Sequence, residues 1–158
     1  MHNDFIIKDT PKKGKGLFAT KDYNKNMILF KFEGVKIVKE DAVKHPNSAG
    51  LLQIGVDLYL DIAGHYSYFM NHSCNPNCYI KIAANTAFCL SFFPIKEGNE
   101  LTFDYATTSS DDLTTWSMPC NCSIFGCRKT ITGFSVLPQK QQASYIELGL
   151  VPKYLRGK

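Results

Sequence analysis

Short runs of alternating apolar and polar residues recur along the first half of this chain, and they predict β-strands. Residues 5–7, 16–19 and 27–38 look extended. In the last of these, apolar side chains alternate with their neighbours until Gly34 interrupts the run. The chain is therefore expected to begin with β-structure.

A further stretch with a period of two spans residues 56–62. Its apolar side chains would lie on one face of a strand, and its polar side chains on a second face that contacts solvent. The apolar face would hold Val56, Leu58, Leu60 and Ile62, and the solvent face Asp57, Tyr59 and Asp61.

Turn-forming residues separate the strands that follow. We expect strands at 79–83 and 86–93, joined by Ala84-Asn85, and a short strand at 100–103 after the turn at 97–99. Many short strands with Gly, Pro and Asn between them argue against a parallel α/β fold. The predicted fold class is mainly β.

Helical patterns are few. Residues 39–45 are expected to form one short turn, and residues 138–148 a terminal helix that Gly149 is placed to end. The polar segment 107–119 reads as a flexible connecting loop.

The composition is that of one domain. With 158 residues, 44% of them hydrophobic, the chain can bury a core without disulfide support. Its 18 basic residues are scattered among 14 acidic ones, so we expect no direct contact with nucleic acid. The sequence has neither a membrane-spanning apolar run nor the pattern of a secretory signal. A soluble intracellular protein is expected, with nothing to distinguish a nucleus, a bacterial cytoplasm or delivery into a host cell.

Three of the six cysteines cluster near the C-terminus, which favours metal over disulfides in a chain of this size. Cys120, Cys122 and Cys127 offer three thiolates within eight positions, whereas tetrahedral zinc takes four ligands. Cys74 lies in a polar turn from which it can reach a neighbouring lobe, while the other cysteines have apolar, strand-like surroundings. We predict a Zn²⁺ site of these four residues, with free buried thiols as the alternative.

Five separated segments of the chain form a recognisable series: residues 14–19, 32–34, 71–77, 100–105 and 120–127. The most specific parts of the series are Asn71-His72-Ser73-Cys74-Asn75 and Phe103-Asp104-Tyr105. The order of the segments resembles that of the SET-domain protein lysine methyltransferases, including the cysteine-rich post-SET segment of many members.

The resemblance implies a β-clip-like SET fold of several small sheets with a pseudoknot. In this fold the Asn71 segment and the strand that ends at Tyr105 lie side by side, one threaded through a loop. The resemblance also divides the chain into four parts. The parts would be a SET domain at 1–106, a connecting loop at 107–119, a post-SET zinc-binding segment at 120–134 and a C-terminal helical tail at 135–158.

The resemblance further implies a protein-lysine N-methyltransferase that uses S-adenosyl-L-methionine. A neutral lysine amine must meet the methyl group in line with the departing sulfur, inside an apolar channel with aromatic walls. Tyr105 matches the catalytic tyrosine of the family, and Phe103 and Phe32 are the expected walls. Phe at position 103 leaves more room than Tyr, so di- or trimethylation is expected. Taken alone, Tyr105 would read as a core tyrosine with a satisfied hydroxyl.

Contacts with the cofactor follow from the same resemblance. Tyr68 stands where an Arg often occurs, so Lys13 or Lys15 is expected to meet the cofactor's carboxylate. Phe134 would either cover the adenine or anchor the tail. The expected cofactor-binding residues are Lys15, Gly16, Leu17, Asn71, His72, Tyr105 and Phe134.

The implied partner is a protein or peptide with a target lysine, with a histone tail among the candidates, and no membrane. Two other classes stand beside the enzyme: a catalytically silent SET-like module that binds a peptide, and an interaction module organised by zinc. The tyrosine, asparagine and glycine-loop segments favour the enzyme.

Overall fold

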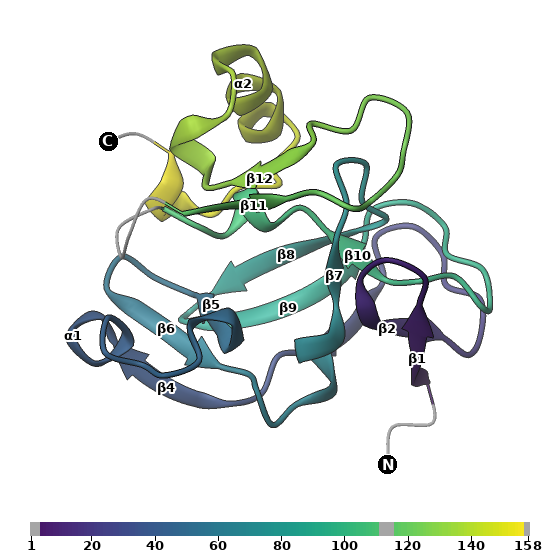
Figure 1. Ribbon diagram of the computed structural model, residues 1–158, viewed down its shortest axis with the longest axis horizontal. Helices are drawn as coiled ribbons and strands as arrows, with labels where there is room; N and C mark the ends of the chain where they lie inside the picture. The colour runs from purple at the N-terminus through teal and green to yellow at the C-terminus, as the bar shows by residue number, and fades with distance from the viewer. Residues whose placement is uncertain (1–3, 111–115, 157–158) are drawn as a thin grey trace.

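The computed structural model describes residues 4–110 and 116–156, which form several small sheets and few helices (Figure 1). The mainly β class is confirmed. The strands are β1 (Phe5–Thr10), β2 (Gly14–Ala19), β3 (Ile28–Lys31), β4 (Val35–Val38), β5 (Leu51–Gln53), β6 (Leu58–Asp61), β7 (Asn71–His72), β8 (Cys78–Ala83), β9 (Thr86–Ser91), β10 (Thr102–Phe103), β11 (Ser117–Pro119) and β12 (Thr130–Thr132). The α-helices are α1 (Lys39–Ala42) and α2 (Gln139–Glu147), and the 3₁₀ turns are Ser48–Gly50, Tyr66–Phe69, Tyr105–Thr107, Phe134–Val136 and Lys153–Leu155.

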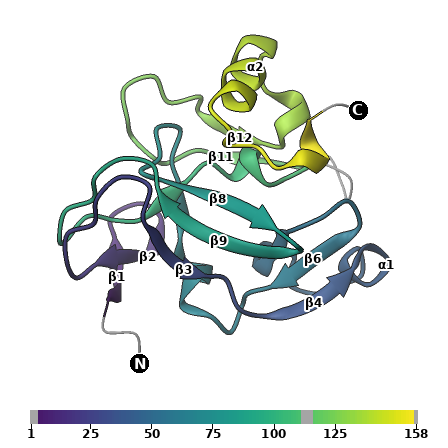
Figure 2. The ribbon, with the colours of Figure 1, turned by 180° about the vertical axis from the view of Figure 1, so that it is seen from behind.

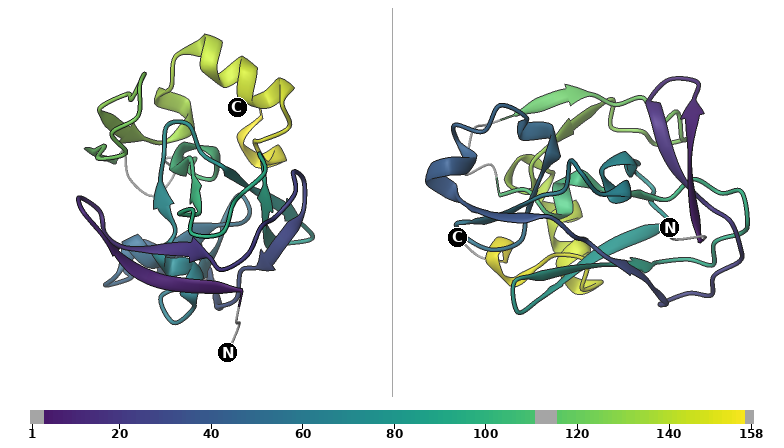
Figure 3. Two further views of the ribbon diagram at one scale, coloured as in Figure 1. Left: turned by 90° about the vertical axis from the view of Figure 1, so that its right-hand side faces the viewer. Right: turned by 90° about the horizontal axis from the view of Figure 1, so that it is seen from below.

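Two antiparallel three-stranded sheets, ordered β3-β9-β8 and β4-β6-β5, make up the centre of the molecule. The strands β1 and β2 form a separate hairpin, and β11 pairs with β12. In Figure 2, α2 lies above β8 and β9, and the hairpin lies below them. In both views of Figure 3 the purple hairpin and the yellow-green helix α2 lie apart from each other.

The two strands that carry the most specific motifs are far apart in sequence and adjacent in space. In the parallel pair β7-β10, Asn71 pairs with Thr102 and His72 with Phe103. The main-chain N–H of Ser73 continues the ladder to the Phe103 oxygen at 3.1 Å. The expected placement of the Asn71 segment beside the strand that leads to Tyr105 is confirmed. The threading of one through a loop stays a prediction.

Two hydrophobic cores hold these elements together. The larger one joins the sheets and includes Phe30, Phe32, Leu60 and Phe103. A smaller core joins the 3₁₀ turn Tyr105–Thr107 to the C-terminal segment, and it consists of Ala106, Phe134, Leu137 and Val151, with Tyr145 and Leu155 packed against it. The C-terminal tail is therefore docked on the body of the protein. None of the described helices has the length and apolar character that a membrane span requires.

The predicted solvent face of residues 56–62 is wrong in part. Tyr59 is only 4% exposed, whereas Val56, expected on the buried face, is 51% exposed and precedes the strand. The C-terminal tail covers this region, because the Tyr154 hydroxyl donates to the main-chain oxygen of Gln53, whose register partner is Tyr59. A period of two in sequence cannot show that a distant segment covers the second face.

The predicted connecting loop also differs in part from the structure. Residues 117–119 form β11 and pair with β12, instead of belonging to a loop. Residues 111–115 of that predicted loop lie outside the described residues. The terminal helix is confirmed, and Gly149 follows it with a φ of +70°, a conformation that favours glycine at a helix end.

Replacing Gly34 by Ala is expected to lower the free energy of unfolding by roughly 3 kcal/mol, the upper end of the cost of overpacking. A Cβ atom at this position would overlap the main-chain oxygen of Asp61, where β4 and β6 approach each other. Denaturant unfolding measures the loss. Gly64→Ala is the control, since a Cβ there has no atom within 4 Å, and equal losses in the two variants would contradict the argument.

Candidate active site and metal centre

Tyr105 is the first residue of the 3₁₀ turn that follows β10, and its ring lies near those of Phe103 and His72. Its hydroxyl donates to the main-chain oxygen of Met70 at 2.8 Å. Its ring centre lies 4.9 Å from that of Phe103 and 5.4 Å from that of His72. Burial raises the pKa of Tyr105 to about 12, so the phenol is protonated at neutral pH. The side chain therefore acts as a hydrogen-bond donor and not as a base.

The two predicted aromatic walls occupy different places. Phe103 lies against Tyr105, as expected. Phe32 belongs to the same core and packs against Phe30 at a ring distance of 5.2 Å, with only 2% of its surface exposed. The structure thus brings Phe103 directly to Tyr105, and it places Phe32 in the surrounding core.

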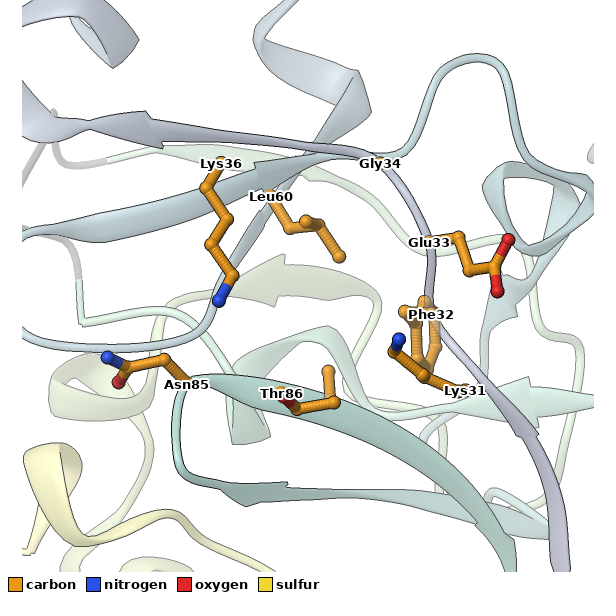
Figure 4. A pocket seen from close by; sticks show the side chains of 9 residues that line it. Lys31, Phe32, Glu33, Gly34, Lys36, Leu60, Asn85 and Thr86 are labelled. Carbon is orange, nitrogen blue, oxygen red and sulfur yellow. The ribbon is translucent and has the colours of Figure 1, made fainter.

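A cavity of about 240 Å³ opens near Phe32, away from the tyrosine. Figure 4 shows Lys36 and Leu60 reaching into it from one side, and Asn85 and Thr86 bordering the other. The residues that line this cavity do not include Asn71, Phe103 or Tyr105. It is therefore not the point at which the predicted catalytic and cofactor-binding residues meet.

Asn71 is held by groups from two other elements. Its Nδ2 donates to the Lys15 main-chain oxygen at 3.0 Å and to Glu100 Oε1 at 2.7 Å. Because a carboxylate only accepts hydrogen bonds, the contact with Glu100 fixes which end of the amide is the nitrogen. Both amide hydrogens are engaged, so the capacity of Asn71 to bind a ligand lies in its Oδ1 oxygen.

Glu100 brings the glycine hairpin to Asn71. Lys13 Nζ donates to Glu100 Oε2 at 2.6 Å, and the main-chain N–H of Leu101 donates to the Leu17 oxygen at 2.7 Å. A Cβ on Gly16 would lie 2.7 Å from Glu100 Oε1, so any larger residue there would displace the carboxylate that binds Asn71. The structure therefore brings together Lys15, Gly16, Leu17 and Asn71, four of the predicted cofactor contacts. The sequence-based list of site residues did not include Glu100, although Glu100 lies inside the matched segment 100–105.

His72 links the tyrosine to the cysteines. Its Nδ1 accepts from the Tyr105 main-chain N–H at 3.3 Å, which leaves the proton on Nε2, 3.3 Å from Cys74 Sγ. Burial lowers the pKa of His72 to about 4. The imidazole is thus neutral, and its 3.5 Å contact with Asp104 is not an ion pair. The expected contact of His72 with the cofactor stays a prediction.

Four cysteine sulfur atoms form a cluster beside this histidine. The ligand atoms of Cys74, Cys120, Cys122 and Cys127 all lie within 4.8 Å of one another. Tetrahedral zinc with Zn–S bonds of about 2.3 Å separates its sulfurs by about 3.8 Å. The Cys74 and Cys120 sulfurs are 3.7 Å apart, which fits. The structure places the Cys74 sulfur as the fourth member of the cluster, and the donor set suits zinc, whose binding stays a prediction.

The thiols of the cluster have unequal acidities. Burial raises the pKa of Cys120 well above its ordinary value. Burial acts in the same direction on Cys122, but hydrogen bonds from the main chain at Cys74 and Ile124 outweigh it and lower the pKa to about 6. Without a metal ion, Cys120 therefore stays protonated, and a divalent cation would be needed to hold all four sulfurs as thiolates.

Phe134 lies in the smaller core with Ala106, Leu137 and Val151. This is the place of a hydrophobic anchor for the tail, one of its two expected roles. Its contact with an adenine ring stays a prediction.

Small sheets, a parallel pair of strands leading to a protonated tyrosine, and an adjacent ring of four cysteines define a SET-type domain with a cysteine-rich lobe. The chain belongs to the SET-domain family. The family model of the SET domain matches residues 14–106, more than half of the chain.

Two relatives found by sequence comparison are much longer than this chain. The chain is 30% identical over 129 residues to histone-lysine N-methyltransferase trithorax of Drosophila virilis, which covers 73% of this chain and 3% of that protein. It is 31% identical over 148 residues to an H3 lysine-36 specific histone-lysine N-methyltransferase of Gibberella zeae, covering 83% of this chain and 15% of that protein. The chain thus spans a small part of these relatives.

Solved structures share the fold. The crystal structure of KRYPTONITE in complex with mCHG DNA and SAH superposes with a TM-score of 0.67 at 21% identity, covering 80% of this chain and 28% of that one. SUVH6 of Arabidopsis thaliana in complex with SAM gives a TM-score of 0.68 at 19% identity, covering 80% of this chain and 33% of that one. At these identities, the likeness concerns the fold.

Proposed function

We propose that this chain is a protein-lysine N-methyltransferase that uses S-adenosyl-L-methionine. One observation carries the proposal: the protonated Tyr105 hydroxyl and the Phe103 ring lie at the end of a strand whose partner, β7, holds Asn71 against the glycine hairpin. A lysine side chain and a methyl donor that approach from these two sides would meet at the tyrosine. The names of the relatives point to the same activity.

The glycine hairpin and Asn71 are the proposed cofactor site. When bound, S-adenosyl-L-methionine supplies an electrophilic methyl group on a positively charged sulfur. The Asn71 Oδ1 oxygen would accept from the ammonium group of the cofactor, and the main chain of Lys15, Gly16 and Leu17 would border it. Because Lys13 already pairs with Glu100 at 2.6 Å, Lys15 is the better candidate for the carboxylate. Phe134 keeps its proposed role beside the adenine.

The tyrosine side of the site would receive the target lysine. A lysine amine has a pKa of about 10.4 in water, and apolar surroundings lower it, so that the neutral nucleophile becomes available. Phe103 would line the lysine stem, and Phe32 keeps its proposed role as a second wall. Tyr105 would orient the amine through its phenol oxygen, which can accept from the amine while its proton is donated to Met70.

The cysteine cluster is proposed to bind Zn²⁺ through Cys74, Cys120, Cys122 and Cys127. Zinc with four protein ligands has no open position for substrate, so its role would be structural. It would fix the cysteine-rich lobe, residues 117–132, against the SET core. The division into SET domain, connecting loop, post-SET segment and tail is retained as part of this proposal, with the loop ending before β11 begins at Ser117.

The test is transfer of labelled methyl from S-adenosyl-L-methionine to histones and lysine peptides, with cofactor binding measured by calorimetry. The names of the relatives make histone tails the first substrates to try. Saturable binding with transfer to lysine supports the proposal. An absence of cofactor binding would overturn it and favour the silent peptide-binding module. Binding without transfer to any lysine of a broad peptide array would count against the enzyme as well.

The replacement of Phe103 by Tyr is expected to shift the products from di- or trimethyl-lysine to mainly monomethyl-lysine. The added hydroxyl, with a water bound to it, would fill the space beside the Tyr105 ring, which lies 4.9 Å away. Mass spectrometry of a peptide product after long incubation measures the distribution. Phe93→Tyr adds the same hydroxyl to a residue that is 45% exposed, and it should leave the product distribution unchanged. An unchanged product distribution in Phe103→Tyr would contradict the prediction.

A further inference from the structure

The Asp104 carboxylate, next to Tyr105, is a buried junction of three parts of the protein. Its side chain is 1% exposed. Oδ1 accepts from the Ala106 main-chain N–H at 3.1 Å and from Arg128 Nη2 at 2.8 Å. Oδ2 accepts from Arg128 Nη1 at 2.7 Å and from the Tyr145 hydroxyl at 2.8 Å. These donors come from the turn that carries Tyr105, from the cysteine-rich lobe and from helix α2.

The junction sets where the Tyr105 turn begins. The Asp104 main-chain oxygen accepts from the Thr107 N–H at 2.9 Å and from the Thr107 hydroxyl at 2.7 Å, while its side chain caps Ala106. Asp104 is thus bonded to the turn through both its main chain and its side chain. A shift of its carboxylate would move the start of the turn, and Tyr105 with it.

Tyr145 is oriented to serve this carboxylate. Gln141 Nε2 donates to the Tyr145 oxygen at 2.9 Å, so the phenol proton is directed to Asp104. Burial, with the Asp104 charge second, raises the pKa of Tyr145 to about 12, which keeps this donor protonated. A hydrogen bond to a buried charged group is stronger than one between neutral groups. Tyr145 lies outside the residues that match the SET family model.

We propose that Tyr145 is a positioning residue that acts on Tyr105 through Asp104, so that helix α2 belongs to the working active site. Arg128 neutralises the Asp104 carboxylate, and Tyr145, from helix α2, fixes the orientation of that carboxylate. The expected effect on turnover rests on the proposed function. The expected effect on the placement of the Tyr105 ring does not.

Tyr145→Phe in the full zinc-loaded chain is the test, since it removes one hydroxyl and keeps the ring. Two experiments are made: the kinetics of methyl transfer to the peptide substrate, which give kcat and KM, and the NMR signal of Tyr105 in protein with ¹³C-labelled tyrosine. The signal is assigned by its loss in Tyr105→Phe. Gln142→Met is the control, because Gln142 lies in the same helix and hydrogen-bonds the main-chain oxygens of Ser135 and Leu137, not Asp104.

We expect Tyr145→Phe to lower kcat about tenfold, as for a reacting group held slightly out of place, with KM changed less than about twofold. The Tyr105 signal should shift in Tyr145→Phe and stay in place in Gln142→Met. An unchanged Tyr105 signal overturns the inference, and so does a full kcat in Tyr145→Phe when the wild type is active. A wild type without any transfer refutes the proposed function instead, and the Tyr105 signal then decides this inference alone. If Tyr145→Phe does not fold, Gln141→Met replaces it, and the same signal should shift.

Discussion

Replacing Tyr105 by Phe is expected to lower kcat about a hundredfold or more, because a reacting group loses the contact that aligns it. The substitution removes the phenol oxygen and leaves the ring against Phe103 and His72. Affinity for the cofactor should change little, since Asn71 and the glycine hairpin are held by Glu100 and not by the tyrosine. Labelled methyl transfer gives kcat, and calorimetry gives the affinity.

The pH dependence of the wild type adds a second expectation to this experiment. Since the pKa of Tyr105 is raised to about 12, its hydroxyl stays protonated throughout the range from neutral to about pH 10. Turnover should therefore rise with pH as more of the target amine is neutral, without a fall caused by the tyrosine. A fall in turnover of the folded protein between pH 8 and 10 would contradict a protonated tyrosine donor.

Tyr23→Phe is the matched control for the tyrosine experiment. It also removes a phenol oxygen that donates to a main-chain oxygen, that of Asp4, at 3.3 Å, in the core near Phe5. A similar loss of stability with kcat retained within about twofold is expected, since exchanges remote from the site act mainly on stability. Equal losses of kcat in the two variants would show that Tyr105 matters only as a core residue.

Local signals in the sequence sufficed for the elements whose structure depends on neighbouring residues. The hairpin of β8 and β9 follows from two apolar runs around Ala84-Asn85, and both of these turn residues have positive φ. Gly34 separates β3 from β4 as the pattern predicted. The choice of Cys74 for the cluster was possible because a polar turn contrasted with apolar strands.

Local sequence signals could not predict the features that depend on contacts between distant segments. Tyr59 is buried because the tail lies over it, and the tail gives no sign of this in its own sequence. The predicted loop ends in β11 because Ser117–Pro119 has a partner strand beyond the cysteines. Asp104 and Glu100 lie inside recognisable motifs, but their partners come from separate parts of the chain. The one available clue to a role for Asp104 and Glu100 was that each is a charged residue in a matched motif to which the sequence analysis assigned no function.

Removal of the metal is expected to abolish methyl transfer while the central sheets remain folded. Arg128 directly follows Cys127, and it holds both oxygens of the Asp104 carboxylate. Without zinc, the cysteine-rich lobe would lose its order, and Asp104 would lose its charged partner next to Tyr105. Structural zinc sites contribute on the order of 10 kcal/mol to the folding of the segments that they organise. We expect less than about 5% of the transfer activity after chelation, with activity restored by added Zn²⁺.

The Cys127→Ser variant distinguishes two explanations. In one, zinc orders only the cysteine-rich lobe; in the other, zinc organises the whole fold. The variant should lose the bound zinc and the activity, while amide exchange in β8 and β9 stays slow, because the core around Phe30 and Phe32 includes no member of the cluster. Cys89→Ala removes a buried thiol outside the cluster and should keep about one zinc per chain, as a four-cysteine site requires. Because each bound thiol must release its proton, zinc affinity should fall as the pH is lowered. Fast exchange in β8 and β9 after chelation would identify the zinc as the organiser of the whole fold, and full transfer activity without zinc would separate the cluster from catalysis.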